Sequence, residues 1–264
     1  MSQSKPELIE TLRVDADGQI PLLELHLERV ARSCAELGYD WDAQTWLQAM
    51  HTALGQAPVN TPLRLRILWN AKASAKAEAQ ALPALEGPLQ LCLSKTPLPA
   101  QDPLLSHKTT HRPWYQDAAA LLEKHPQLFD VIFLDTQSRV CEGSRSNIYI
   151  QDEQGHWWTP PAQGWLLPGV QRQALLNSGL ARETELFLDD LLHARAIRVS
   201  NALRGRPQQI GLNADRTDNH RHCDQFLAAG QLLDGDRVHG IPEPAVVQLG
   251  GRDPGEPVGR SGLP

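Results

Sequence analysis

Hydrophobic and polar residues alternate in LIETLRV at residues 8–14, and a period of two is typical of a β-strand with one buried face. Over residues 22–38 the apolar residues instead recur at helical spacing, and the segment ends at a glycine, as helices often do. Asp42 is suited to capping the start of a second helix, which continues to Leu54. The alternation returns at residues 62–70 and predicts a second strand.

An alanine-rich segment of low complexity follows at residues 71–87, and it predicts either a short surface helix or a loose loop. Residues 88–96 alternate again, which indicates another strand. Beyond residue 104 the two patterns are mixed, with helices expected over 117–125 and 169–180 and strands over 131–140, 146–161 and 195–201. This order lacks the regular alternation of βαβ units, so it favours an α+β fold.

Changes in composition divide the chain into four parts. The proline-marked PLPAQDPL at residues 97–104 is the best candidate for a connection between domains, so we expect an N-terminal α+β domain at 1–98 and a linker at 99–104. A second domain is expected at 105–222. Residues 223–264 are rich in glycine and proline without periodicity, so this tail is expected to be disordered.

Charge and cysteine content exclude several classes of protein. With 264 residues, 41% of them hydrophobic, the chain can bury a sizeable core, and its net charge of −6 gives no general attraction to nucleic acid or anionic membranes. No leader-like start and no apolar run long enough to span a bilayer are evident, so a cytoplasmic protein is expected. The four cysteines are far apart and lack the spacing of a zinc site, so neither disulfides nor a metal are expected.

Five short segments carry the candidate chemistry. In chain order they are HLER with Arg29, SHKTTHR with Lys108, RVCEGSRSNIYI with Glu142 and Asn147, LLPGVQR with Val170 and Gln171, and SNALRG with Ser200, Asn201 and Arg204. Each residue taken alone is most often a solvated surface group. Together, their order and spacing resemble the fold-type IV family of pyridoxal-phosphate enzymes, which contains branched-chain and D-amino-acid aminotransferases and aminodeoxychorismate lyase.

The resemblance implies a role for each segment. The lysine that matches Lys108 bonds to the cofactor aldehyde and then acts as acid and base, which requires a lowered pKa. Arg29 matches the arginine that binds the cofactor phosphate, and the backbone amides of Val170 and Gln171 would bind the same anion at the start of a helix. Gln171 replaces the usual threonine. Ser200, beside Asn201, would complete this phosphate site.

Two further positions concern the cofactor ring. Glu142 resembles the glutamate that keeps the pyridine nitrogen protonated, so that the ring can accept electrons, and Asn147 enters the strand that follows it. Tyr115 is a candidate partner of the cofactor's phenolic oxygen or of the substrate. The implied fold has two domains, an N-terminal α/β sandwich and a C-terminal β-barrel-like domain with helices, and the implied assembly is a homodimer.

Within the family, the wording of HKTTHR and SNALRG is closer to aminodeoxychorismate lyase, which makes 4-aminobenzoate and pyruvate for folate biosynthesis. For that reaction Thr11 is a candidate catalytic residue, or merely a β-branched strand residue. Arg112 and Arg204 are candidate receptors for substrate carboxylates. An aminotransferase on the same scaffold and a non-catalytic cofactor-binding member remain alternatives. Family chains have a further strand and loop before the position that corresponds to Leu8. Few residues precede Leu8 here, so differences are expected on the substrate side of the pocket.

Overall fold

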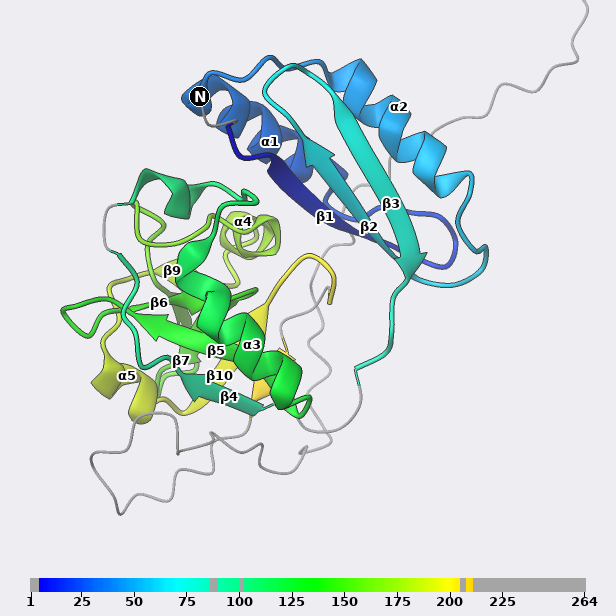
Figure 1. Cartoon of the computed structure of the whole chain (residues 1–264). Helices are drawn as coiled ribbons and strands as arrows, with labels where there is room; N and C mark the ends of the chain where they lie inside the picture. Colours follow the sequence, from blue (N-terminus) through cyan, green and yellow to red (C-terminus); the bar gives the residue numbers. More distant parts are fainter. Residues whose placement is uncertain (1–4, 86–89, 100–101, 205–207, 211–264) are drawn as a thin grey trace, which may run out of the picture.

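The computed structural model describes residues 5–85, 90–99, 102–204 and 208–210, and the predicted tail at 223–264 lies outside them. Helices and mixed sheets form two lobes, as Figure 1 shows, and the predicted α+β class is confirmed. The lobe at the top right of the view contains the N-terminal elements. The lobe at the lower left contains the elements that follow residue 89.

The N-terminal lobe is an antiparallel sheet covered on one face by two helices. Its strands are β1 (Leu8–Val14), β2 (Leu63–Trp69) and β3 (Ala75–Ala81), in that order, and its helices are α1 (Leu23–Leu37) and α2 (Ala43–Leu54). Alternate residues of β2 are buried, so the predicted period of two is confirmed. Leu65 and Ile67 of β2 pack with Trp46 and Met50 of α2, and all four are fully buried.

Strand β3 corrects the expectation of a helix or loop over the alanine-rich segment. Ala75, Ala77 and Ala79 pack against the N-terminal core, whereas the polar residues between them are exposed. Alanine is a good helix former and the segment is low in complexity, so local composition pointed away from a strand. The seven-residue pairing with β2 overrides that local preference, and the small side chains fit beneath α2.

The second lobe contains two sheets. One has the order β4-β5-β6 and the other the order β11-β10-β7-β8-β9, and helix α3 packs against β5. Its strands are β4 (Gln90–Leu93), β5 (Leu128–Leu134), β6 (Val140–Gly143), β7 (Asn147–Gln151), β8 (Trp157–Thr159), β9 (Arg182–Glu183), β10 (Ala196–Ser200) and β11 (Gln208–Ile210). Its helices are α3 (Gln116–Lys124), α4 (Val170–Asn177) and α5 (Leu188–Leu192), with 3-10 turns at Pro103–Ser106 and Pro113–Tyr115.

The pairing of β4 bears on where the two lobes divide. The expected domain boundary at residues 98–99 placed this strand in the N-terminal domain, but β4 pairs in parallel with β5 of the second lobe. The change of lobe therefore lies between β3 and β4, ahead of the expected linker at 99–104. Apolar alternation marks a strand but cannot say which sheet it joins.

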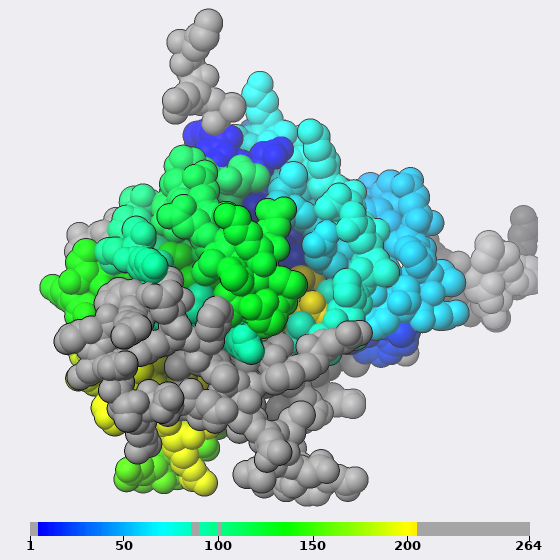
Figure 2. Space-filling model, turned by 60° about the horizontal axis from the view of Figure 1, so that its bottom comes forward, coloured from blue at the N-terminus to red at the C-terminus, as the bar shows by residue number. Residues whose placement is uncertain are grey.

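Backbone hydrogen bonds join the lobes at β1. The amide of Ile9 donates to the carbonyl of Lys108 at 2.6 Å, and the amide of Thr110 donates to the carbonyl of Glu7 at 2.8 Å. Arg13, farther along β1, donates to the carbonyl of Leu203. In the space-filling view of Figure 2 the yellow end of the described chain shows between the green and cyan lobes. The SHKTTHR and SNALRG segments thus both meet the N-terminal sheet.

Candidate active site

Lys108 lies where the second lobe meets the edge of the N-terminal sheet. Its carbonyl is held by Ile9, and the residue is partly buried. Burial, together with the positive charges of Arg112 and Arg29, lowers the pKa of the amine from 10.5 to about 7, against the opposing effect of Glu10 and Glu142. A substantial fraction of this amine is therefore neutral, and nucleophilic, near pH 7.

Arg29 projects from α1 onto a buried carboxylate of β1. Its Nε and Nη2 atoms donate to the two oxygens of Glu10 at 2.9 and 2.6 Å, and Nδ1 of His26 lies 2.6 Å from the second oxygen. Burial alone would raise the pKa of Glu10, but Arg29 and His26 outweigh it and the pKa falls to about 2. Glu10 is therefore ionised, and the guanidinium is held in one orientation.

The start of α4 faces the same region of α1. Arg29 and Val170 line a small pocket of about 30 Å³ between the two helices. Gly169 caps α4 without a side-chain hydrogen bond, so the first amides of the helix, those of Val170 and Gln171, have no intrahelical acceptor. A guanidinium and free helix amides form an electropositive corner suited to an anion.

Glu142 is buried at the end of β6 and is held on one side. Its Oε1 atom accepts from the hydroxyl of Tyr115 at 2.6 Å and from the amide of Leu167 at 3.0 Å, whereas Oε2 has only a 3.5 Å contact from Asn147. Burial raises the pKa of Glu142 to about 7, against the opposing effects of Arg112 and the two donors to Oε1. Oε2 therefore retains the capacity to accept a strong hydrogen bond from a cationic partner.

Tyr115 links the glutamate to a candidate substrate residue. The guanidinium of Arg112 lies over its ring, 4.3 Å from the centroid, while its hydroxyl is occupied by Glu142. Arg112 influences the pKa of both Lys108 and Glu142, so it lies among the charged groups of the site. The contact of Tyr115 with cofactor or substrate stays a prediction, and the structure gives this side chain a hold on Glu142.

A buried aspartate shapes the loop after Glu142. Asp130 on β5 accepts hydrogen bonds from the hydroxyls of Ser144 and Ser146 at 2.6 and 2.5 Å and from the amide of Arg145 at 3.2 Å. A Cβ atom at Gly143 would lie 2.2 Å from Oδ2 of Asp130, so only glycine fits there. The EGSRSN segment is therefore built around one carboxylate that sets the exit of the chain from β6.

Asn147 connects this loop to the helix start. Its side-chain amide donates to the carbonyl of Leu167 at 3.0 Å and lies 3.5 Å from Oε2 of Glu142. A Cβ atom at Gly169 would lie 2.0 Å from Oδ1 of Asn147, so the side chain of Asn147 can approach the backbone this closely because residue 169 is glycine. The candidate ring and phosphate residues are thereby held at a defined separation.

The remaining candidates lie around this centre. Ser200 on β10 pairs in register with Asn147, and its hydroxyl shares a 2.8 Å hydrogen bond with Tyr149, while Asn201 donates to the carbonyl of Arg145. Arg204 instead donates to the carbonyl of Pro83 at 2.6 Å in the connection between the lobes.

Thr11 alternates with Glu10 along β1, on the same face as Arg13, which reaches Leu203 of the second lobe. Its hydroxyl therefore belongs to the face that meets the second lobe. The functional roles expected for Thr11, Ser200, Asn201 and Arg204 stay predictions.

Two carboxylates of this centre were missed by sequence reasoning. Glu10 lies in the strand predicted at residues 8–14, and Asp130 comes just before the strand predicted to begin at residue 131. A polar residue on the apolar face of LIETLRV, in phase with Leu8 and Leu12, was the available signal for Glu10. No comparable signal marks Asp130.

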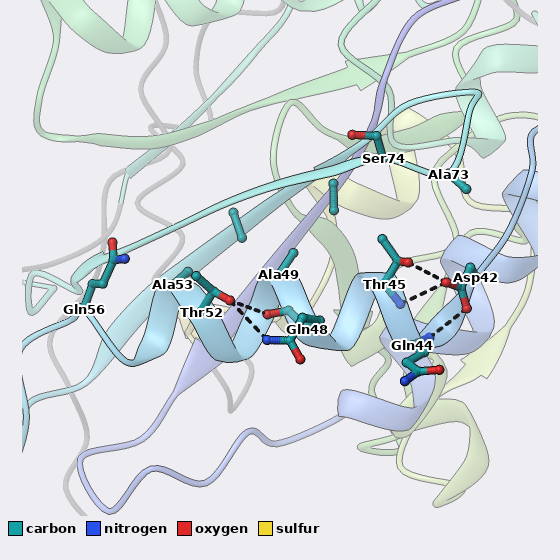
Figure 3. Close-up of a pocket in the computed structure, with 12 residues that line it drawn as sticks. Asp42, Gln44, Thr45, Gln48, Ala49, Thr52, Ala53, Gln56, Ala73 and Ser74 are labelled. Carbon is teal, nitrogen blue, oxygen red and sulfur yellow. Dashed lines mark hydrogen bonds between the residues drawn. The ribbon is translucent and has the colours of Figure 1, made fainter.

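A broad hollow of about 650 Å³ lies elsewhere, between α2 and β3. Figure 3 shows that it is lined by polar and alanine side chains, with Asp42 capping α2 at one end. Strand β3 is at the sheet edge opposite to β1, so this hollow is remote from Lys108. Among the described residues no cluster of His, Cys, Asp and Glu could hold a metal, and no helix has the length and apolarity to cross a membrane.

The centre has the groups that a phosphorylated aldehyde of a pyridine requires. Lys108 offers an amine with a lowered pKa, Glu142 an oxygen with spare acceptor capacity, and Arg29 with α4 an unsatisfied set of donors. These three features lie on separate elements that the fold brings together. The residues present therefore fit pyridoxal 5'-phosphate.

Comparisons with known proteins agree with this assignment. The chain matches the family described as Amino-transferase class IV over residues 7–206. A candidate aminodeoxychorismate lyase of Schizosaccharomyces pombe is 28% identical over 196 residues, which cover 71% of this chain and 83% of that protein. A candidate amino-acid aminotransferase of Mesorhizobium loti is 33% identical with a TM-score of 0.71, covering 78% of this chain and 98% of the other.

A more distant solved structure supports the same fold. A hypothetical aminotransferase of Mycobacterium tuberculosis in its PLP-bound form is 22% identical with a TM-score of 0.63, covering 77% of this chain and 80% of that one. The family match extends over most of the described residues, and the fold and the donor set agree with it. The chain belongs to the class IV aminotransferase family, whose members are pyridoxal-phosphate enzymes acting as lyases or aminotransferases, and its cofactor is pyridoxal 5'-phosphate.

Proposed function

We propose that the protein is an aminodeoxychorismate lyase, which converts 4-amino-4-deoxychorismate into 4-aminobenzoate and pyruvate. The observation that carries the proposal is the position of Arg112, four residues after Lys108, where its charge lowers the pKa of the reacting amine. A cation beside that amine favours an anionic substrate. The similarity to the candidate lyase of Schizosaccharomyces pombe supports the same reaction.

Each residue of the site has a distinct task in this reaction. When bound, the cofactor supplies an electron-accepting ring for the carbon that loses a proton. Lys108 takes that proton at its Nζ atom, because an amine with a pKa of about 7 can both accept and release a proton near neutral pH. Oε2 of Glu142 would accept a hydrogen bond from the protonated ring nitrogen. Arg29 and the first amides of α4 would bind the phosphate.

The substrate carries carboxylates that the acidic chain must neutralise locally. Arg112 is held in place by the ring of Tyr115 beneath it, so its guanidinium is oriented as a carboxylate receptor. Arg204 is the second candidate receptor, and Thr11 is the candidate hydroxyl on the β1 face that meets the second lobe. We also expect a homodimer in which the neighbouring chain helps to close the site.

The reaction is tested by its products. Purified protein given 4-amino-4-deoxychorismate should release pyruvate and 4-aminobenzoate in equal amounts, and Arg112→Met should raise KM for this substrate about tenfold or more. Lys124→Met, at the exposed end of α3, is the matched control for loss of one cation. Absence of both products from the wild-type protein, with cofactor bound, would reject the lyase.

An aminotransferase is the second candidate, favoured by the 33% identity with the candidate amino-acid aminotransferase of Mesorhizobium loti. It would form glutamate from 2-oxoglutarate in a reaction that depends on a donor amino acid. A non-catalytic member would form neither set of products. Borohydride reduction should trap the cofactor on wild-type protein but not on Lys108→Ala, which separates a lysine-bonded enzyme from a protein that only binds the cofactor.

A further inference from the structure

Glu10 on β1 has no place in the chemistry described so far, although it is among the most heavily bonded side chains of the site. It is 3% exposed, and it lies against His26 and Arg29, which are 0% and 6% exposed. Three donors on α1 converge on its two oxygens at 2.6 to 2.9 Å. Burying a carboxylate costs free energy unless its oxygens are hydrogen-bonded in the interior. These three contacts therefore fix the position of the Glu10 carboxylate.

The contacts of Glu10 use one edge of the Arg29 guanidinium. A guanidinium can hold one carboxylate through the Nε and Nη2 edge and a second oxyanion through the Nη1 and Nη2 end. Glu10 occupies the first edge, and no hydrogen bond among the described residues uses Nη1. Arg29 also lines the small pocket that it shares with Val170 at the start of α4. The end of the guanidinium is therefore available for an anion in that corner.

The same strand holds the reacting lysine. Ile9, the residue before Glu10, donates its amide to the carbonyl of Lys108 at 2.6 Å. Two consecutive residues of β1 thus hold two parts of the site. Ile9 holds the segment of Lys108 through its backbone, and Glu10 holds Arg29 through its side chain. The arm that joins the phosphate to the cofactor ring is short, so the amine and the guanidinium have to be held within a narrow range of distances from each other.

We propose that Glu10 is a positioning residue, which orients the guanidinium of Arg29 so that its free end faces the cofactor phosphate. The proposal rests on the cofactor assignment and is independent of whether the enzyme is a lyase or an aminotransferase. His26 supports the arrangement by donating from Nδ1 to the same carboxylate. Burial lowers the pKa of His26 against the effect of Glu10, so the imidazole is neutral and Glu10 offsets the charge of Arg29.

A purely electrostatic role makes the opposite prediction. If Glu10 only neutralised Arg29, its removal would leave the anion site more positive and would strengthen binding of a phosphate. If Glu10 orients Arg29, its removal frees the guanidinium to rotate and weakens that binding. The direction of the change in phosphate affinity therefore separates the two roles.

The experiment compares pyridoxal 5'-phosphate with pyridoxal, which carries the same aldehyde without the phosphate. Dissociation constants for both are measured by absorbance titration of cofactor-free wild type, Glu10→Gln and Glu10→Ala. We expect the preference for the phosphorylated compound to fall about tenfold or more in Glu10→Ala, and by less in Glu10→Gln, which can still accept from Nε of Arg29. The affinity for pyridoxal should change little. An unchanged affinity would indicate that the variant is folded and that Lys108 can still bond to the aldehyde.

A double-mutant cycle with Arg29→Met tests whether Glu10 acts through the arginine. In that background Glu10→Gln should leave the phosphate preference unchanged. Glu24→Gln, the same substitution at an exposed position of α1, serves as control. An unchanged or increased preference in both Glu10 variants would overturn the proposal, as would an equal loss in the Arg29→Met background. Wild-type protein that binds both compounds equally would overturn the phosphate assignment itself, and this proposal with it.

Discussion

Replacing Lys108 by methionine should make the cofactor-free protein more stable at neutral pH while abolishing its activity. The buried amine is a stability cost, because folding lowers its pKa from 10.5 to about 7. At about 1.36 kcal/mol per pH unit, that difference corresponds to at most about 5 kcal/mol. Methionine has a similar length and no charge to desolvate, so Lys108→Met removes the cost without leaving a large cavity.

The pH dependence of this effect has a definite sign. Between about pH 7 and 10.5 the unfolded chain binds a proton at residue 108 that the folded chain does not, so the stability of wild type rises with pH by up to about 1.36 kcal/mol per unit. Below pH 7 both states are protonated and the full cost is present. The advantage of Lys108→Met should therefore be greatest below pH 7 and should shrink towards pH 10.

Urea unfolding of cofactor-free wild type and Lys108→Met, measured from pH 6 to 9.5, gives the difference in the free energy of unfolding directly. Lys124→Met, which removes an exposed lysine, should show no such pH-dependent difference from wild type. A Lys108→Met protein that is less stable than wild type below pH 7, or a difference that does not vary with pH, would refute the assignment of a buried, perturbed amine.

Three further substitutions test the frame around the cofactor. Glu142→Gln should lower kcat by about a hundredfold or more in steady-state assays, because an amide cannot stabilise the protonated ring nitrogen, and near-normal turnover would contradict that role. Gly169→Ala places a Cβ atom 2.0 Å from Oδ1 of Asn147, so urea unfolding should show a loss of about 1 to 3 kcal/mol. Gly55→Ala, where the nearest atom is 3.5 Å away, should be neutral or stabilising. Asp130→Asn should cost about 1 to 3 kcal/mol in the same assay, because the two serine hydroxyls lose a shared charged acceptor; unchanged stability would contradict its organising role.

The sequence by itself determined most of the secondary structure and singled out the candidate reacting groups. Apolar periodicity is a local property, so β1, α1, α2, β2 and α4 were predictable from their own residues. Lys108, Arg29 and Glu142 were predicted as site residues through motifs whose order along the chain is itself sequence information. The α+β class was predicted from the same patterns, and the structure confirms it.

Only the tertiary structure decided how these groups are held. The alanine-rich segment is a strand because β2 pairs with it, and β4 joins the second lobe because β5 pairs with it. Glu10 became part of the site because α1 packs its charged face onto β1. Pairing between distant segments and the burial of a charge are properties of neighbours in space, so neither is encoded in the local pattern of residues.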